Sequence, residues 1–230
     1  MNYFITGTDT EIGKTTITSG LLLAFAAHGR RAAGMKPVAA GFAHDSRAVS
    51  EDAEQLIACS VPGLTHKEVN PYLLKAPTSP HIAAQLEQRI IEWSPIATAF
   101  KYLNRVAEVV LVEGVGGWQV PLSAELMLAD IPRRLNLPVI LVAGIRLGAI
   151  NHTLLTAQAI RADGCQLRGW IANIVDCDYA YIAESLATLR ERLNEPCLAV
   201  VPWTATPSPR EIMQSLLHVP ALLEFDAPSL

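Results

Sequence analysis

Short apolar runs alternate along this chain with longer stretches in which apolar and polar positions follow a helical period. Apolar runs of this length between turn residues are typical of buried strands, whereas the longer amphipathic stretches indicate helices. We predict strands at residues 3–6, 32–38, 109–112, 139–143, 170–175 and 198–201. We predict helices at residues 15–28, 50–59, 80–88, 95–107, 126–136, 151–163 and 179–193.

The regular alternation of strand and helix predicts an α/β fold in one domain over residues 1–230. Such spacing favours right-handed crossovers and a mostly parallel central sheet with helices on both faces. Residues 60–80 hold several prolines and little periodicity, so we expect loops there. The proline-rich stretch near residue 207 breaks the pattern, and we expect residues 205–230 to be peripheral. In such sheets ligands bind beyond the carboxyl ends of the strands, which is where the motifs below fall.

Composition narrows the class of protein. Half of the residues are hydrophobic, 17% are charged and 6% are aromatic, which indicates an aliphatic core. The net charge of −4 argues against a nucleic-acid partner. No basic leader and no membrane-spanning apolar run is visible, so we expect no membrane partner and a cytoplasmic location. The cysteines form no close pair and are expected to be reduced: Cys59, Cys165, Cys177 and Cys197.

The clearest motif, GTDTEIGKTT at residues 7–16, follows a predicted strand and opens a predicted helix. A helix N-terminus with free N–H groups and a favourable dipole suits phosphate oxygens. Gly13 lets the backbone approach the phosphates, Lys14 places a charge on the β- and γ-phosphates, and Thr15 offers a hydroxyl to Mg²⁺. The usual pattern has four residues between its glycines, whereas Gly7 and Gly13 enclose five. The motif predicts a nucleoside triphosphate and Mg²⁺ as ligands.

A carboxylate and a lysine also lie at strand ends. Glu113 ends a buried strand and is followed by glycines, as expected of a residue that holds Mg²⁺ beside a phosphate loop. Lys36 lies at the end of the predicted second strand, and Pro37 keeps it out of helical conformation. A second positive charge there would stabilise charge that develops during phosphoryl transfer. A lone lysine at a strand end is more often a solvated surface group, so both interpretations stay open.

Two further features are ambiguous from the residues alone. Asp52 lies at an acidic helix start, which usually only matches the helix dipole, and Glu51 and Glu54 are equal rivals by composition. Residues 144–152 follow a strand and open a helix, so free N–H groups there could hold a carboxylate. Arg146 in that segment is either an anion clamp or a surface charge, and His152 is expected to be structural.

Taken together, the motifs resemble dethiobiotin synthetase. The resemblance runs from the first strand to about residue 204, in the order of that family. The five-residue gap between the glycines is also a habit of this family. The motifs are TGTDTEIGKT at 6–15, KPV at 36–38, NPY at 70–72, PTSPH at 77–81, VEG at 112–114, GGW at 116–118, GAINH at 148–152, LTA at 155–157, WIAN at 170–173 and PW at 202–203.

The resemblance implies a cytosolic homodimer with a Rossmann-like P-loop fold. It implies a ligase that uses ATP and Mg²⁺ to join 7,8-diaminononanoate and CO₂ and to close the ureido ring of dethiobiotin. In that scheme one amine captures CO₂ as a carbamate, whose oxygen attacks the γ-phosphate. The second amine then closes the ring and expels phosphate. This is the penultimate step of biotin synthesis.

The resemblance also assigns roles by position. Lys36 matches the catalytic lysine and Lys14 supports it, whereas Thr15, Asp52 and Glu113 match the metal ligands. The nucleotide-binding positions are Glu11, Ile12, Gly13, Lys14, Thr15, Thr16, Asp52, Glu113, Gly114, Val115, Gly116, Asn173, Pro202, Trp203 and Thr204. The substrate-binding positions are Ala40, Gly148, Ala149, Ile150 and Asn151, the last four reaching across the dimer to the carboxylate of the diamine. Each active site would thus be shared between two chains.

Three departures from the family pattern bear on these roles. Ala40 stands where a Ser or Thr usually contacts the substrate, so only a backbone contact is implied there. Ile174 stands where Asp commonly follows the adenine-reading Asn173. The loop between residues 38 and 52 differs in length and composition, so Glu51 is the alternative to Asp52 as metal ligand.

Two other classes of protein share such a loop. Partitioning ATPases usually carry a second lysine within it, but here Thr8 and Asp9 occupy that part of the loop. The apolar C-terminal stretch 212–223 is nearly free of basic residues, which argues against membrane attachment. Amidoligases usually add a glutamine-hydrolysing domain, for which this chain has no room.

Overall fold

The central sheet is six-stranded and parallel. The structure, a computed structural model, describes residues 1–42 and 49–221. The strand order is β2-β5-β1-β6-β7-β8, and every neighbouring pair is parallel. This confirms the predicted α/β class. The strands are β1 (Asn2–Gly7), β2 (Ala32–Met35), β5 (Val109–Glu113), β6 (Val139–Ile145), β7 (Leu167–Ile174) and β8 (Cys197–Val201).

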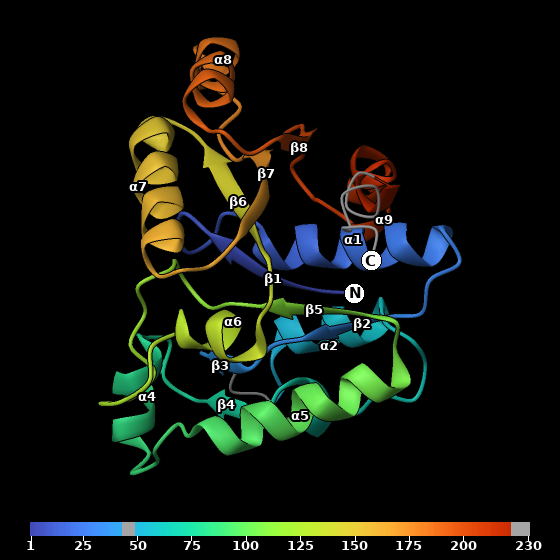
Figure 1. Ribbon diagram of the computed structural model, residues 1–230, viewed down its shortest axis with the longest axis vertical. Helices are drawn as coiled ribbons and strands as arrows, with labels where there is room; N and C mark the ends of the chain where they lie inside the picture. The colour runs from blue at the N-terminus through green and yellow to red at the C-terminus, as the bar shows by residue number, and fades with distance from the viewer. Residues whose placement is uncertain (43–48, 222–230) are drawn as a thin grey trace.

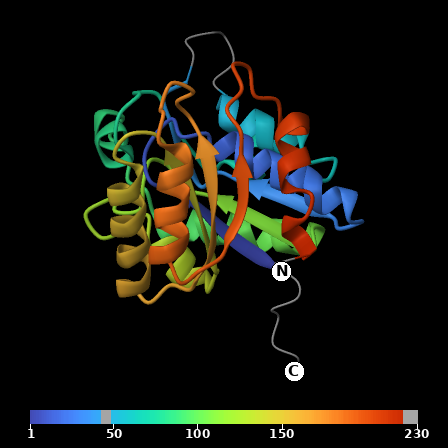
Figure 2. The same ribbon diagram turned by 90° about the horizontal axis from the view of Figure 1, so that it is seen from above.

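Helices cover both faces of this sheet (Figures 1 and 2). One face carries α1 (Lys14–Ala27), α2 (Glu51–Ala58) and α9 (Pro209–Leu216). The other carries α5 (Trp93–Val106), α6 (Asp130–Leu135), α7 (Ala149–Ala162) and α8 (Ile182–Arg192). Alternate strand residues enter the two cores, as the two-residue period of a strand requires: Tyr3 and Ile5 face α1, whereas Phe4 packs on the opposite side.

The predicted single strand at 32–38 is wrong, because two separate strands occupy this stretch. β2 ends at Met35, and β3 (Val38–Ala40) pairs with β4 (Tyr72–Leu74) in a second, two-stranded sheet. The backbone N–H of Lys36 donates to Val69 O at 2.8 Å, outside the large sheet. Pro37 has no N–H to continue a ladder. Residues 60–80 therefore contain β4 and α3 (His66–Val69) as well as loops, and α4 (Pro80–Leu86) follows them.

Two other predictions need correction. The helix predicted at 126–136 is confined to α6, because a bridge between Pro121 and Met127 holds the preceding residues in an extended turn. The C-terminal segment is not wholly peripheral, since Ile212 and Leu216 of α9 are buried against α1. Gly20 of α1 permits this approach, because a Cβ there would lie 3.0 Å from both side chains. The part of that segment at 222–230 lies outside the described residues, as does 43–48 of the loop preceding Asp52.

Two properties concern the whole described chain. All four cysteines are free thiols, as expected. Across residues 1–42 and 49–221, no helix has both the length and the apolar character that crossing a membrane requires.

Candidate active site

The phosphate loop lies between β1 and α1, as predicted. Gly13 is the residue before the helix and has a φ of 81°, a left-handed conformation that favours glycine. A Cβ at Gly13 would also lie 2.5 Å from Asn173 Nδ2. That amide nitrogen donates to Ile12 O at 2.8 Å, which ties the loop to the end of β7. Glycine is required here by both its conformation and the close approach of Asn173.

Lys14 lies along its own loop. Its Nζ donates to Asp9 O at 2.6 Å, and Asp9 Oδ2 forms an ion pair with Arg146 Nη2 at 2.6 Å. Arg146 therefore pairs with the phosphate loop through a side chain that is 43% exposed, and its role as an anion clamp or a surface charge stays open. Burial and the nearby charge of Lys36 lower the pKa of Lys14 to about 8. A bound triphosphate would favour the charged form of this amine.

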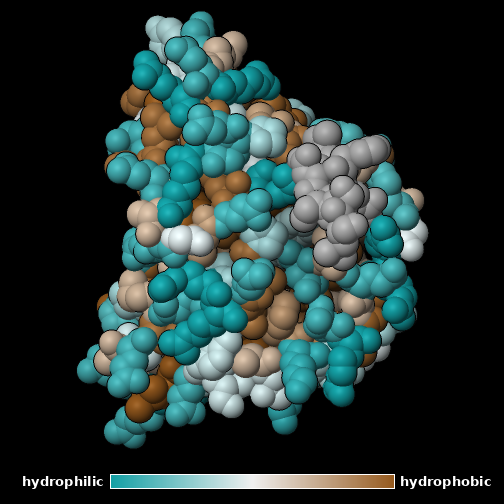
Figure 3. Space-filling view, viewed as in Figure 1, coloured by the Kyte–Doolittle hydropathy of each residue, from teal (hydrophilic) through white to brown (hydrophobic). Residues whose placement is uncertain are grey.

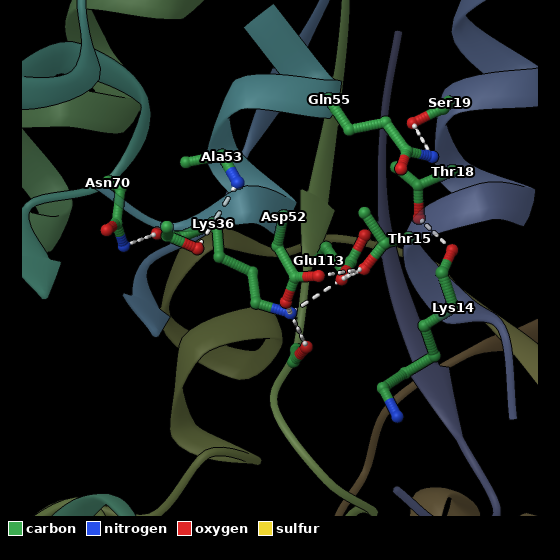
Figure 4. Close-up of polar contacts among 12 residues, drawn as sticks. Lys14, Thr15, Thr18, Ser19, Lys36, Asp52, Ala53, Gln55, Asn70 and Glu113 are labelled. Carbon is green, nitrogen blue, oxygen red and sulfur yellow. Dashed lines mark hydrogen bonds and ion pairs between the residues drawn. The ribbon is translucent and has the colours of Figure 1, made fainter. Parts of the chain in front are cut away.

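A cluster of one lysine, two carboxylates and one hydroxyl lies beside the loop, and Figure 4 shows the amine of Lys36 between Asp52 and Glu113. Lys36 Nζ is 2.6 Å from Glu113 Oε1 and 2.8 Å from Asp52 Oδ2. It also donates to Gly114 O at 3.2 Å. The hydroxyl oxygen of Thr15 is 2.9 Å from Asp52 Oδ1 and 2.7 Å from Glu113 Oε1. These contacts join residues that are far apart in sequence.

Each member of the cluster is placed by its element. Lys36 leaves the large sheet at the point where β2 ends, and Asn70 Nδ2 donates to its carbonyl at 2.6 Å. Asp52 lies in the first turn of α2, whose N-cap, Ser50, accepts from the backbone of Ala53. This turn brings the carboxylate of Asp52 to Lys36 and leaves Glu51 exposed. Of these two candidate metal ligands, Asp52 is therefore the one that lies in the cluster. Glu113 ends β5 and is fully buried.

The charges of the cluster stabilise one another. Burial alone would lower the pKa of Lys36, but the charges of Glu113 and Asp52 outweigh it and hold the pKa above its ordinary value. Burial would raise the pKa of Asp52, yet the Lys36 charge and hydrogen bonds from Lys36 and Thr15 hold it below its ordinary value. Lys36 is thus an ammonium in contact with carboxylates.

The donor set of the cluster fits a magnesium ion. Glu113 Oε2 is buried and has no hydrogen-bond partner among the described residues, although a buried carboxylate oxygen normally has one. Mg²⁺ prefers one or two carboxylates, completed by water and phosphate oxygens. Thr15, Asp52 and Glu113 supply a hydroxyl and two carboxylates beside the phosphate loop. The unpartnered oxygen and the neighbouring hydroxyl are what such an ion would require.

A pocket of about 190 Å³ adjoins the phosphate loop. Ile174 lines it, so the residue that departs from the family pattern faces this space directly. Val175, Pro207 and Ile212 line it as well, and the sequence prediction did not include them. Closeness in the chain to Asn173 and Trp203 was the only sequence signal for Val175 and Pro207, whereas Ile212 lies in α9 and had no such signal. The predicted nucleotide positions that line it are Glu11, Gly13, Thr16, Asn173, Pro202, Trp203 and Thr204.

The remaining predicted positions lie on three other segments. The segment from Gly114 to Gly116 runs along the loop, since a Cβ on Gly116 would be 3.7 Å from Thr10 Oγ1. The segment 148–151 forms the start of α7, with Gly148 at a φ of 91°. Ala40 ends β3 and is half-buried. Within residues 1–42 and 49–221, no hydrogen bond or ion pair joins Ala40 or segment 148–151 to the lysine–carboxylate cluster.

Two contributors were given no role from sequence. Asp9 holds Lys14 through its carbonyl and Arg146 through its carboxylate. Asn70 fixes the backbone of Lys36. Asn70 stands in one of the motifs that carry the family resemblance, and this was the signal that could have indicated its role.

The comparisons with known proteins decide the family. A family model described as an AAA domain matches residues 1–210. A protein of Xanthomonas euvesicatoria named ATP-dependent dethiobiotin synthetase BioD is 51% identical over 202 residues, 87% of this chain and 90% of its own length. One of the same name from Aromatoleum aromaticum is 49% identical over 217 residues, 93% and 96% of the two chains. The chain belongs to the dethiobiotin synthetase family.

Solved structures resemble this dethiobiotin synthetase family member in fold alone. The MinC:MinD cell division complex of Aquifex aeolicus aligns with a TM-score of 0.61 at 12% identity, covering 100% of this chain and 98% of the other. A ParA family ATPase of Chlorobium tepidum aligns with a TM-score of 0.56 at 10% identity, covering 99% and 93%. These matches confirm the P-loop fold. Membership of the dethiobiotin synthetase family makes the chain an ATP-dependent enzyme.

The lowered pKa of Lys14 predicts proton uptake when ATP binds. Burial lowers the pKa of Lys14 to about 8 and the triphosphate would raise it again, so binding near that pH should take up a fraction of a proton. Titration calorimetry at pH 8 with ATP and Mg²⁺, in two buffers of different ionisation enthalpy, measures this uptake. We expect it to disappear in Lys14→Met. Equal heats in both buffers for the unmodified chain would contradict the prediction.

Proposed function

We propose that this chain uses ATP to carboxylate 7,8-diaminononanoate with CO₂ and to close the ureido ring of dethiobiotin, releasing ADP and phosphate. The observation that carries the proposal is the contact of Lys36 with Asp52 and Glu113 beside the phosphate loop, in a chain of this family. We propose a cytoplasmic location and no macromolecular partner except a second copy.

In this proposal the phosphate loop orients the nucleotide. The backbone N–H groups at the start of α1 hold the phosphates, and Lys14 exchanges the carbonyl of Asp9 for a phosphate oxygen. The base enters the pocket between Asn173 and Trp203. Because Ile174 brings no carboxylate next to Asn173, the polar side chains left to contact the base are those of Asn173 and of Glu11, Thr16 and Thr204 in the pocket lining.

Lys36 acts on the group that is transferred. A carbamate formed from one amine and CO₂ attacks the γ-phosphorus, the bond to the ADP oxygen breaks, and a carbamic–phosphoric anhydride results. The second amine then attacks the carbonyl carbon and phosphate leaves. An ammonium beside these oxygens stabilises the negative charge that gathers there during both steps. Lys36 stabilises the negative charge on these oxygens by its own positive charge and by donated hydrogen bonds. Lys14 contacts the same phosphoryl group from the side of the phosphate loop.

Thr15, Asp52 and Glu113 would hold the magnesium ion. When bound, Mg²⁺ neutralises and orients the phosphate oxygens during transfer. The buried Glu113 Oε2 without a partner supports this assignment.

The start of α7 would bind the carboxylate of the diamine in the partner subunit. The N–H groups of the first helical turn suit an anion, although that of Ala149 donates to Arg146 O at 3.0 Å and would have to exchange this partner for the carboxylate. Leu147 is 82% exposed and Leu86 of α4 is 70% exposed. In the space-filling view, hydrophobic side chains reach the surface in separate patches on the side of the molecule that carries α7 and α4 (Figure 3). Such surface favours association, and a homodimer would cover it and share each active site.

A phosphate-release assay tests the proposed reaction. The chain is given ATP, Mg²⁺ and bicarbonate, with and without 7,8-diaminononanoate. We expect phosphate release to depend on both bicarbonate and the diamine, with dethiobiotin formed in equal amount. Phosphate release that is the same without the diamine would contradict the proposal and favour a simple ATPase.

Mixing two inactive chains tests the shared site. Lys36→Ala removes the phosphoryl-side lysine, and Asn151→Asp places a negative charge beside the N–H groups that are proposed to hold the carboxylate of the diamine. If the diamine bridges two subunits, a heterodimer of these chains contains one intact site, so mixing should restore partial activity. Native mass spectrometry confirms that heterodimers form. Confirmed heterodimers that stay inactive would indicate that each chain holds a complete site.

A further inference from the structure

The ammonium of Lys36 is fully engaged by the protein. An ammonium has three N–H donors. Those of Lys36 face Glu113 Oε1 at 2.6 Å, Asp52 Oδ2 at 2.8 Å and Gly114 O at 3.2 Å. None is left for a phosphate or carbamate oxygen. Lys36 must therefore give up a partner before it can act on a substrate.

The partners of Lys36 are also the carboxylates that fit the metal ion. Glu113 is fully buried, and without a cation beside it a buried carboxylate is strongly disfavoured. Lys36 supplies that cation in this structure. A divalent ion bound by Asp52 and Glu113 would neutralise the same carboxylates. The ammonium of Lys36 would then no longer be needed as their counter-charge.

The surroundings permit such an exchange. The side chain of Asp52 is 44% exposed, so the carboxylate pair is open on this side, whereas Lys36 is 4% exposed. Figure 4 shows Lys14 apart from the carboxylates, with its amine directed away from them. Lys14 therefore adds positive charge nearby without occupying the pair, which makes it a suitable control.

We propose that Lys36 and the divalent ion compete for the Asp52–Glu113 pair, so that Lys36 is held away from the reacting groups until the metal enters. Lys36 is then both a counter-ion that stabilises the site before catalysis and the residue released by metal binding. The inference rests on the proposed function, because it assumes that these carboxylates take a divalent ion.

Manganese binding without nucleotide or diamine tests the competition. Mn²⁺ is titrated into the unmodified chain, Lys36→Met and Lys14→Met, and free Mn²⁺ is measured by electron paramagnetic resonance. Removing the competing ammonium should tighten Mn²⁺ binding by about tenfold or more in Lys36→Met, and by less than about threefold in Lys14→Met. Unchanged or weaker binding in Lys36→Met, or equal tightening in both variants, would overturn the proposal. Since neither ATP nor the diamine is present, this outcome is separate from failure of the proposed reaction.

The unmodified chain offers a second measurement if Lys36→Met does not fold. Reductive methylation labels amines that solvent can reach, and mass spectrometry reports the label at Lys36. We expect Mg²⁺ alone to raise methylation of Lys36 several-fold and to leave exposed lysines, such as Lys67, unchanged. Methylation of Lys36 that Mg²⁺ does not alter would overturn the proposal.

Discussion

Lys36→Ala is expected to lower kcat on the order of 10³-fold, the usual cost of removing a group that stabilises transition-state charge. Affinity for ATP with Mg²⁺ should not fall, because Lys14 and the loop amides still bind the phosphates and the carboxylates no longer hold a competing ammonium. Steady-state kinetics with the diamine, together with calorimetric titration of the nucleotide, separate the two effects.

Lys14→Ala provides the comparison for this prediction. Lys14 contacts the loop carbonyl of Asp9 and would contact phosphate in both ground state and transition state, so its loss should weaken nucleotide binding as well as turnover. Turnover retained in Lys36→Ala, or a loss confined to nucleotide affinity, would remove Lys36 from the proposed chemistry.

Glu113→Gln is expected to have the largest effect on stability. The substitution leaves the buried Lys36 without its closest carboxylate, at 2.6 Å. Breaking a buried ion pair by removing one partner costs about 3 kcal/mol or more, so the free energy of unfolding should fall by about that amount. Urea unfolding at pH 7 without Mg²⁺ measures it.

Asp52→Asn is the matched control, because it removes a carboxylate from the same lysine at a more exposed position. The Asp52 side chain is 44% exposed, and ion pairs open to solvent contribute less than about 1 kcal/mol. If Asp52→Asn destabilised the chain as much as Glu113→Gln, burial would not be the reason for the stability of the cluster.

The sequence predicted the elements that are fixed by local pattern. The phosphate loop and five of the six strands of the central sheet were placed correctly, because short aliphatic runs between turns have few other structures open to them. The strand predicted at 32–38 failed because the apolar run continues through Lys36 and Pro37, whereas the backbone partner of Lys36 is Val69. That partner is distant in sequence, so periodicity carries no signal for it.

In the candidate site, too, the sequence predicted features that depend on neighbouring residues and missed those that depend on contacts between distant segments. Glu113 and Lys36 could be named because each follows a strand. The choice between Asp52 and Glu51 could not be made, since it depends on the direction of the first turn of α2. Nor could the pattern indicate that Lys36 contacts the carboxylates themselves, because this pairing arises only when β2, α2 and β5 pack together. The metal and substrate roles of these residues stay predictions.

Oxygen transfer from bicarbonate to phosphate tests the central claim most directly. If a carbamate oxygen attacks the γ-phosphorus, one oxygen of CO₂ must leave with the phosphate when the ring closes. Fresh ¹⁸O-labelled bicarbonate in unlabelled water, followed over a single turnover with ATP, Mg²⁺ and the diamine, should place one ¹⁸O in each phosphate and one in the ureido carbonyl. Unlabelled phosphate formed together with labelled dethiobiotin would contradict a carbamate as the phosphoryl acceptor.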